Sequence, residues 1–275
     1  MNDVSATALF TLRCHALDAA SRKSILNDVS AVRTIELIQD RYGYVKMKKP
    51  EPRLVAYIVL RAQKFDQVVR DFIQKHPNAV VVNIGCGLDN RFERVDNKKI
   101  LYYDLDLPDI ISIKKEIFPE TDRYKYFSTS VFSTDWIQEV PKDRPVLFLA
   151  EGVFMYCEES DVRSLFGNLE QHFQSFEFLF EVVKADWLKG WKYKIIEFKM
   201  RRELKFGSTA VFRFGLPDSR TLESWRSGYK LLEEWSSLDS NHPQLGALRF
   251  FRNFDWFRHT LWSVHYAYNE ASEQL

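Results

Sequence analysis

Two glycines and two acids, each placed at the end of an apolar run, are the residues of this chain most readily linked to chemistry. Gly85 and Gly87 follow the apolar run at 80–84, and Asp104 and Asp106 close the next one. A strand, a glycine turn and an acid on the following strand are how a doubly wound sheet holds an adenosine-type cofactor. Glycine lets the backbone approach a ligand, and a carboxylate accepts hydrogen bonds from ribose hydroxyls. The spacing therefore predicts a nucleoside-binding site.

The residues beside the glycines indicate which cofactor binds. A dinucleotide fingerprint has a third glycine, or an alanine, where this chain has Asn90, and Asp89 is a poor neighbour for a pyrophosphate. An acid suits a ligand with a positive centre. S-adenosylmethionine fits, because it combines adenosine with a sulfonium cation and an amino group and has no phosphate. The alternative is a tight strand-to-helix turn that binds no ligand, and the pair Asp104 and Asp106 favours the cofactor.

Composition disfavours several other classes of protein. The 275 residues allow one large α/β domain or two small ones, and we expect a single domain. The 39 basic and 38 acidic residues nearly cancel, which disfavours a nucleic-acid partner. Cysteines and histidines are scattered without metal-site spacing, so we expect no metal, and free thiols in a reducing compartment. No signal peptide or membrane-span-length apolar stretch is evident, so we expect a cytoplasmic protein.

Helices and strands alternate along most of the chain. Apolar residues recur on one face from residue 53 to residue 75, which predicts an amphipathic helix. The strands and helices that follow are typical of an α/β fold with a mostly parallel, doubly wound sheet. Two last strands, at 230–235 and 261–268, are expected to be antiparallel to each other. The earlier strands are expected at 79–84, 100–105, 124–128, 145–150 and 176–183.

Two segments lie outside this alternation. Residues 1–52 are expected to form an N-terminal helical cap, with Ser30 capping a helix and a loop at 41–52 broken by two prolines. Residues 184–228 are rich in lysine, arginine and tryptophan, contain several glycines, and interrupt the rhythm of strands and helices. We expect this insertion to form a helical lid over the acceptor pocket.

Three further side chains are candidates for the site. Arg61 borders the apolar stripe of the helix at 53–75, where a guanidinium can bind the carboxylate of the cofactor or make a structural ion pair, for example with Asp66. Glu151 follows the strand at 145–150, at the edge where open sheets bind ligands. It can face the sulfonium or amino group of the cofactor, or stabilise the start of a helix. Tyr156 can face the acceptor or lie in the core or on the surface.

The order of these motifs resembles the leucine carboxyl methyltransferase family, which includes protein phosphatase carboxyl methyltransferases and bacterial O-methyltransferases of polyketide pathways. The resemblance covers about residues 53–185 and is weaker on either side. It implies a class I methyltransferase fold with a seven-stranded sheet. The matching strings are RAQKFD (61–66), NIGCGLDNR (83–91), YDLDLP (103–108) and AEGVFMY (150–156), with Lys114 and Trp136.

The resemblance implies a role for several residues. Arg61 would bind the methionine carboxylate, Asp106 the ribose, and Glu151 the methionine end of the cofactor. Where the family often has Asp-Leu after the third strand, this chain has Ser130 and Val131. This departure puts the adenine contact in doubt, because a turn hydroxyl is the ordinary alternative. The residues expected to contact the cofactor are Arg61, Gly85, Cys86, Gly87, Asp104, Asp106, Ser130, Val131 and Glu151, and Tyr156 is expected to contact the substrate.

We therefore expect an S-adenosylmethionine-dependent O-methyltransferase that acts on a carboxylate or hydroxyl of a small acidic or phenolic molecule, with no nucleic-acid or membrane partner. A carboxylate acceptor needs no base, whereas a hydroxyl acceptor needs one that the sequence does not identify. Two alternatives remain. One is a nicotinamide-dependent oxidoreductase on the same sheet, against which the missing third glycine argues. The other is a non-catalytic cofactor-binding or scaffold protein, which Ser130 favours.

Overall fold

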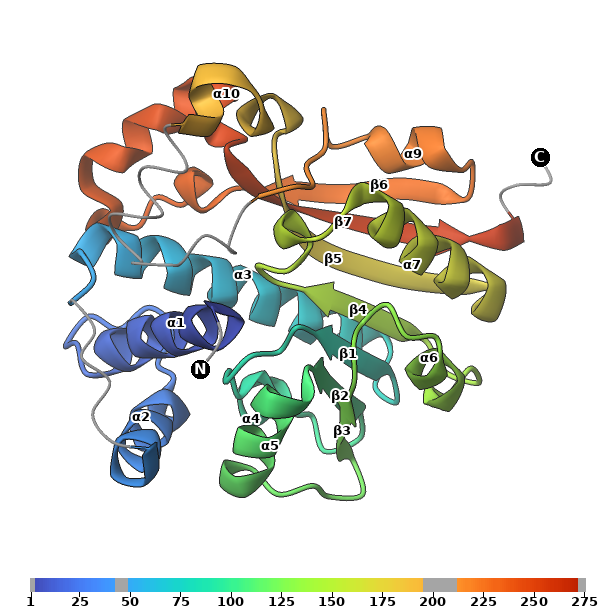
Figure 1. The fold of residues 1–275 in the computed structure, drawn as a ribbon, viewed down its shortest axis with the longest axis horizontal. Helices are drawn as coiled ribbons and strands as arrows, with labels where there is room; N and C mark the ends of the chain where they lie inside the picture. Colours follow the sequence, from blue (N-terminus) through green and yellow to red (C-terminus); the bar gives the residue numbers. More distant parts are fainter. Residues whose placement is uncertain (1–2, 43–48, 195–211, 272–275) are drawn as a thin grey trace.

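A seven-stranded sheet forms the centre of the protein (Figure 1). The computed structural model describes residues 3–42, 49–194 and 212–271. The strands are β1 (Val80–Ile84), β2 (Leu101–Asp106), β3 (Tyr124–Ser128), β4 (Val146–Ala150), β5 (Ser175–Val183), β6 (Tyr229–Trp235) and β7 (Leu261–Asn269). Their order is β3-β2-β1-β4-β5-β7-β6, with β1 to β5 parallel and β7 antiparallel to both of its neighbours. The predicted doubly wound, mostly parallel α/β sheet is confirmed.

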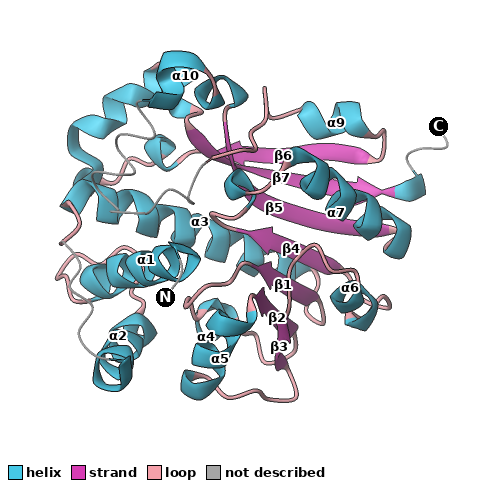
Figure 2. Ribbon diagram, in the orientation of Figure 1, coloured by secondary structure: helices cyan, strands magenta, loops and turns pink. Residues whose placement is uncertain are grey.

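Helices cover both faces of the sheet (Figure 2). One face is covered by α6 (Asp135–Glu139), α7 (Glu159–His172) and α9 (Thr221–Trp225), which pack onto the aromatic part of the core. The other is covered by α3 (Pro52–Lys75), α4 (Arg91–Val95) and α5 (Pro108–Ile117). Every residue of β1 and β4 is buried as a result, which is why these strands read as continuous apolar runs.

Of the two N-terminal helices, α1 (Asp3–Ala19) lies beside α3, and α2 (Val29–Tyr42) packs against α1 (Figure 1). The prediction that Ser30 caps α2 is wrong by two residues. The helix begins at Val29, and the carboxylate of Asp28 accepts the N–H of Ala31 at 3.2 Å and the hydroxyl of Ser30 at 2.6 Å. Aspartate is as good an N-cap as serine, so residue type alone did not distinguish the two.

Short helices surround the ends of the strands after β4. They are η1 (Phe154–Tyr156), η2 (Ala185–Leu188), η3 (Ser237–Asp239), η4 (Pro243–Asn253) and α10 (Asp255–Arg258). Residues 195–211 of the expected lid lie outside the described residues. The described flanks of that segment meet at a bridge between Lys184 and Leu216. Across the described ranges, no helix is long and apolar enough to span a membrane, and the three cysteines are free thiols.

Candidate functional site

The turn after β1 has the geometry that its two glycines permit. Gly85 and Gly87 have φ angles of 62° and 53°, in the left-handed region that favours glycine. The N–H groups of Gly85 and Cys86 donate to the carbonyl oxygen of Leu105, at 2.7 and 3.2 Å, and tie the turn to β2. A Cβ at position 85 would lie 2.4 Å from the side chain of Val153. Position 85 therefore requires glycine for its backbone angle and for its surroundings.

Asp106, the last residue of β2, binds this turn. Its carboxylate accepts the N–H groups of Gly87 and Leu107, both at 2.7 Å. Burial raises the pKa of Asp106 above its ordinary value of 3.8, although the two N–H groups oppose the shift. The residue is 8% exposed, and each of its oxygens has a second lone pair. Asp106 can therefore accept further hydrogen bonds from ribose hydroxyls.

Asp104 lies two residues earlier, on the same face of β2, and is enclosed by protein groups. The amide of Asn83 donates to it at 2.9 Å and the ammonium of Lys114 at 2.6 Å, and the hydroxyl of Tyr124 donates as well. Burial would lower the pKa of Lys114, but Asp104 raises it above its ordinary range. Asp104 is thus held in a buried ion pair, and its predicted contact with the cofactor stays a prediction.

Arg61 extends from α3 toward the ends of β4 and β5. Its Nε donates to Oε1 of Glu151 and its Nη1 donates to Oε2 of Glu181, both at 2.8 Å. Burial would raise the pKa of Glu151, but the guanidinium groups of Arg61 and Arg91 lower it below its ordinary value. Arg61 thus makes the structural ion pair given as the alternative, but with acids elsewhere in the chain and not with Asp66, whose carboxylate lies 2.8 Å from Arg91. Arg61 therefore joins the helix to two acids of the sheet.

Two buried arginines of α4, Arg91 and Arg94, had no predicted role. Arg91 is 2% exposed and donates to Asp66 and Glu151. Arg94 donates to Asp66 at 2.6 Å and to Asp89 at 2.7 Å. Burial would raise the pKa of Asp89, but Arg94 and Arg91 hold it well below its ordinary value. The one indication of these ion pairs in the sequence was that Asp89 and Arg91 directly follow the glycine turn.

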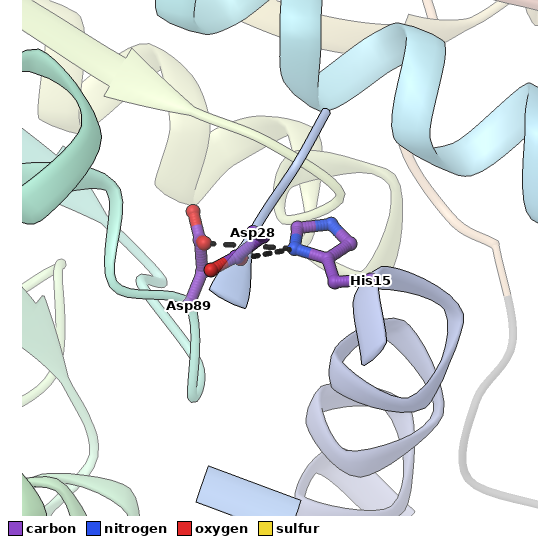
Figure 3. A group of neighbouring side chains, drawn as sticks. All are labelled: His15, Asp28 and Asp89. Atoms are coloured by element: carbon purple, nitrogen blue, oxygen red, sulfur yellow. Dashed lines mark hydrogen bonds and ion pairs between the residues drawn. The ribbon is translucent and has the colours of Figure 1, made fainter. Parts of the chain in front are cut away.

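His15, Asp28 and Asp89 come together from three distant parts of the chain (Figure 3). Nδ1 of His15 lies 3.0 Å from a carboxylate oxygen of Asp28 and 3.7 Å from one of Asp89. One histidine and two acids could in principle hold a metal ion. However, Nη1 of Arg94 donates to both carboxylates, at 2.8 and 2.7 Å. A guanidinium thus lies where a cation would bind, and we interpret the group as ion pairs that fasten α1 and α2 to the glycine turn.

The segment after β3 lies beside the end of β2. The N–H of Thr129 donates to the carbonyl oxygen of Asp106 at 3.1 Å. The hydroxyl of Ser130 accepts the N–H of Phe132 at 3.3 Å, and the carbonyl of Val131 accepts an indole N–H at 3.0 Å. These are turn interactions, which is the alternative stated for Ser130. The adenine contact of Ser130 and Val131 stays a prediction.

Tyr156 lies in η1, next to the Arg61 and Glu181 pair. Burial raises the pKa of its hydroxyl to about 12, and the nearby carboxylate of Glu181 adds to the shift. Its ring packs edge-on against Phe212 with a centroid distance of 5.4 Å. The side chain therefore borders both the arginine and the described end of the expected lid, and its contact with a substrate stays a prediction.

Acids outnumber arginines in the ion pairs around the strand ends, and His15 also contacts two of these acids. The guanidinium groups of Arg61, Arg91 and Arg94 contact the carboxylates of Asp28, Asp66, Asp89, Glu151 and Glu181. The exposed Arg70 also reaches Asp66 at 3.8 Å, and among these contacts the acids outnumber the arginines even when it is counted. S-adenosylmethionine has a sulfonium, an ammonium and a carboxylate, so it carries one net positive charge. The residues at the strand ends fit such a ligand in the glycine turn and in Asp106, the acid that ends β2.

Comparison with known proteins agrees with this fit. A sequence profile of the leucine carboxyl methyltransferase family matches residues 15–170. The tetracenomycin polyketide synthesis O-methyltransferase TcmP of Streptomyces glaucescens is 32% identical over 241 residues, which cover 87% of this chain and 85% of that protein. The S-adenosyl-L-methionine-dependent methyltransferase dpfgK of Gibberella zeae is 27% identical over 269 residues, covering 91% of this chain and 89% of that one.

A solved structure has a similar fold at much lower sequence identity. The crystal structure of a DUF574 family protein from Streptomyces avermitilis superposes with a TM-score of 0.57 and 10% identity, covering 94% of this chain and 96% of that one. The match supports the fold alone. The family profile and the two methyltransferase relatives decide against the oxidoreductase alternative. The chain therefore belongs to the leucine carboxyl methyltransferase family and is an S-adenosylmethionine-dependent methyltransferase.

Proposed function

We propose that the protein transfers a methyl group to a carboxylate or hydroxyl oxygen of a small acidic or phenolic molecule, with the cofactor held at the ends of β1, β2 and β4. The observation that carries this proposal most is the position of Arg61. Its side chain is 14% exposed between Glu151 and Glu181, while the glycine turn and Asp106 lie at the neighbouring strand ends. A carboxylate-binding cation and a ribose-binding acid are the groups that the two ends of the cofactor require.

Each residue has a distinct task in this proposal. The turn at Gly85 and Gly87 brings backbone close to the cofactor, and Asp106 accepts hydrogen bonds from the ribose. Arg61 binds the methionine carboxylate, and Glu151 opposes the positive charge of the methionine end. The bound cofactor supplies a methyl group on a cationic sulfur. The protein then contributes mainly by aligning the acceptor oxygen with that methyl group and by excluding water.

Binding is tested by calorimetry with S-adenosylmethionine and S-adenosylhomocysteine. We expect dissociation constants in the low-micromolar range, about −7 to −8 kcal/mol. Arg61→Ala should weaken binding by about 2–4 kcal/mol, because it removes a charge-assisted contact. If Arg61 is only structural, the melting temperature falls while the affinity of the folded protein is unchanged. No heat with either compound at millimolar concentration would refute the proposed site.

The acceptor is tested by the chemistry of the product. TcmP is named as an O-methyltransferase, which supports an oxygen acceptor in this protein. Transfer from isotopically labelled S-adenosylmethionine to small aromatic acids and phenols distinguishes the two kinds of oxygen. A methyl ester releases its label as methanol in mild alkali, whereas an aryl methyl ether retains it. Cofactor binding without turnover on either class would refute the proposed acceptor.

We further infer that acceptor specificity lies in residues 184–228, with residues 1–52 acting as a cap on the cofactor. In support, the N–H of Arg213 donates to the carbonyl oxygen of Met155 at 2.7 Å, and Phe212 packs on Tyr156. Ala8 of α1 lies 3.3 Å from the point where a Cβ on Gly87 would be. Phe212→Ala should change the KM of the acceptor while the affinity for S-adenosylhomocysteine stays within about twofold. A parallel loss of cofactor affinity would contradict this division.

A further inference from the structure

Glu181 is a buried carboxylate that lies beside the proposed cofactor site without belonging to any of its sequence motifs. It lies on β5 and is 1% exposed. Its Oε2 accepts Nη1 of Arg61 at 2.8 Å. Burial raises the pKa of Glu181, and Arg61 opposes that shift. Burying a carboxylate this deeply costs free energy unless a charged group pairs with it and donates hydrogen bonds to it.

What Glu181 does is visible in the way Arg61 is held. Glu151, directly after β4, accepts a hydrogen bond from Nε of the guanidinium, and Glu181 on β5 accepts one from Nη1. Its Nη2 has no such acid among the described residues. That group lies 3.8 Å from where a Cβ on Gly152 would be, and Gly152 has a φ angle of 70°. The Nη2 side of the guanidinium therefore lies next to a residue without a side chain, where Oε2 of Glu181 is 3.7 Å from the same point.

We infer that Glu181 is a positioning residue of the cofactor site, which fixes Arg61 so that the Nη2 edge of its guanidinium meets the carboxylate of S-adenosylmethionine. The inference rests on the proposed role of Arg61. A long arginine side chain loses rotamer freedom when it binds a ligand. Glu151 and Glu181 restrict the rotamers of Arg61 before the cofactor binds, which lowers the entropic cost of association. Glu181 itself touches neither the cofactor nor the acceptor in this arrangement.

The test replaces Glu181 by glutamine and compares it with a matched variant of the same strand. Glu177 lies four residues earlier on the same face of β5 and pairs with His265 at 2.8 Å, away from Arg61. Glu181→Gln should raise the dissociation constant for S-adenosylhomocysteine and the KM for S-adenosylmethionine about tenfold, the scale of one disordered side chain. The KM of the acceptor should change less than twofold, and Glu177→Gln should leave all three within about twofold.

A double-mutant cycle with Arg61 shows whether Glu181 acts through it. In the Arg61→Ala background, Glu181→Gln should have no further effect on cofactor affinity. An equal loss in both backgrounds would overturn the inference, because Glu181 would then act independently. If Arg61→Ala weakens binding but Glu181→Gln does not, the inference fails and the proposed function stands. If Arg61→Ala has no effect, the proposed cofactor site fails first.

A second variant covers the case in which Glu181→Gln does not fold. Glu181→Asp keeps the charge, and with it the compensation of Arg61, but shortens the reach to Nη1. We expect this variant to remain folded with a dissociation constant between those of the native protein and Arg61→Ala. A melting temperature that falls with no change in affinity would show that Glu181 is purely structural and would overturn the inference.

Discussion

Asp104 and Asp106 lie two residues apart on the same face of β2, yet their surroundings differ completely. Asp104 is 1% exposed and is bound by Lys114, Asn83 and the hydroxyl of Tyr124. Asp106 is 8% exposed, and within the described part of the chain it accepts hydrogen bonds from two backbone N–H groups. Two residues along the strand therefore separate an acid whose hydrogen bonds are all made within the protein from an acid that can still accept hydrogen bonds from a ligand. The difference shows that depth below the strand end decides the role of an acid on this strand.

The same distinction applies to the arginines. The side chain of Arg91 is 1% exposed and donates hydrogen bonds to Asp66, Asn83 and Glu151. The side chain of Arg61 is 14% exposed. We call Asp66, Arg91, Asp104 and Lys114 the inner charges, and Arg61, Asp106 and Glu151 the outer charges. The inner charges should govern stability, and the outer charges should govern affinity for the cofactor.

The largest effect is expected at an inner charge. Arg91→Met removes a buried guanidinium that donates to Asp66 and Glu151, which keep Arg94 and Arg61 as partners. The loss of two charge-assisted hydrogen bonds should lower the free energy of unfolding by roughly 3–5 kcal/mol. Urea denaturation of the ligand-free protein measures this loss. Arg33→Met is the matched control, because Arg33 pairs with Glu93 at the surface, with 62% and 53% of the two side chains exposed. That variant should change stability by less than about 1 kcal/mol, and similar losses in both would break the distinction.

Lys114→Met tests the inner charge closest to the predicted ribose acid. It strands the carboxylate of Asp104 in the core, so we expect a loss of stability of about 3 kcal/mol. Adding Asp104→Asn should restore part of it, since the unpaired charge is then removed. Calorimetry on the folded fraction should give the native affinity for S-adenosylhomocysteine in both variants. A loss of affinity in the double variant would move Asp104 to the outer charges and support its predicted contact with the cofactor.

Asp106 should show the opposite behaviour. Asp106→Asn keeps the size of the side chain but removes the charged acceptor of the ribose hydroxyls. We expect affinity for S-adenosylhomocysteine to fall by about 2 kcal/mol, roughly thirtyfold. The free energy of unfolding should fall by about 1 kcal/mol, because the amide nitrogen leaves one of the two backbone N–H groups without an acceptor. A variant that unfolds without losing affinity would place Asp106 among the inner charges.

The pH dependence of binding should separate the same groups. Burial raises the pKa of Asp106, whereas arginines hold the pKa of Asp89 and Glu151 below their ordinary values. On acidification Asp106 is therefore protonated first, and affinity that needs its charge is lost as pH falls through that raised pKa. The stability due to Asp89 and Glu151 is lost only at lower pH. Burial also raises the pKa of Glu181, so this residue could cause the same loss of affinity on acidification. If Asp106 is the group responsible, the loss should disappear in Asp106→Asn and remain in Glu181→Gln.

The smallest expected effect comes from adding an outer charge. Ser130→Asp restores the acid that the family often carries after the third strand, and its carboxylate can still accept the N–H of Phe132 that the serine hydroxyl accepts at 3.3 Å. We expect affinity for S-adenosylhomocysteine to improve by about 1 kcal/mol, roughly fivefold. Calorimetry measures the gain, and Ser133→Asp in the same turn is the control. An unchanged or weaker affinity would indicate that residue 130 does not reach the adenine.

Most of the fold was predictable because its signals are local. The apolar stripe predicted a helix at 53–75, and the structure has it at Pro52–Lys75. The apolar runs predicted all seven strands to within a few residues. The glycine turn was predictable too, since Gly85 and Gly87 adopt the positive φ angles that their type permits. Each of these features depends on neighbours within a few residues along the chain.

The partners of the charged residues were not predictable in this way. Glu181 reads as one of two glutamates in a mainly apolar strand, and nothing near it in sequence indicates an arginine partner. Asp66 is in the same helix as Arg61 but pairs with Arg91 and Arg94. His15 and Asp28 meet Asp89 across the fold. These choices depend on how α1, α3 and α4 are placed against the sheet, which residue spacing does not encode.

The wide sequence spacing of the Arg61 contacts also has a kinetic consequence. Arg61 is 90 residues from Glu151 and 120 residues from Glu181. Closing loops of this length costs conformational entropy that a single helix such as α3 does not, although the cost grows only slowly with loop length. During synthesis Arg61 emerges before both of its acids. We therefore expect its contacts with them to form only once β4 and β5 have joined the sheet, after the local structure of α3.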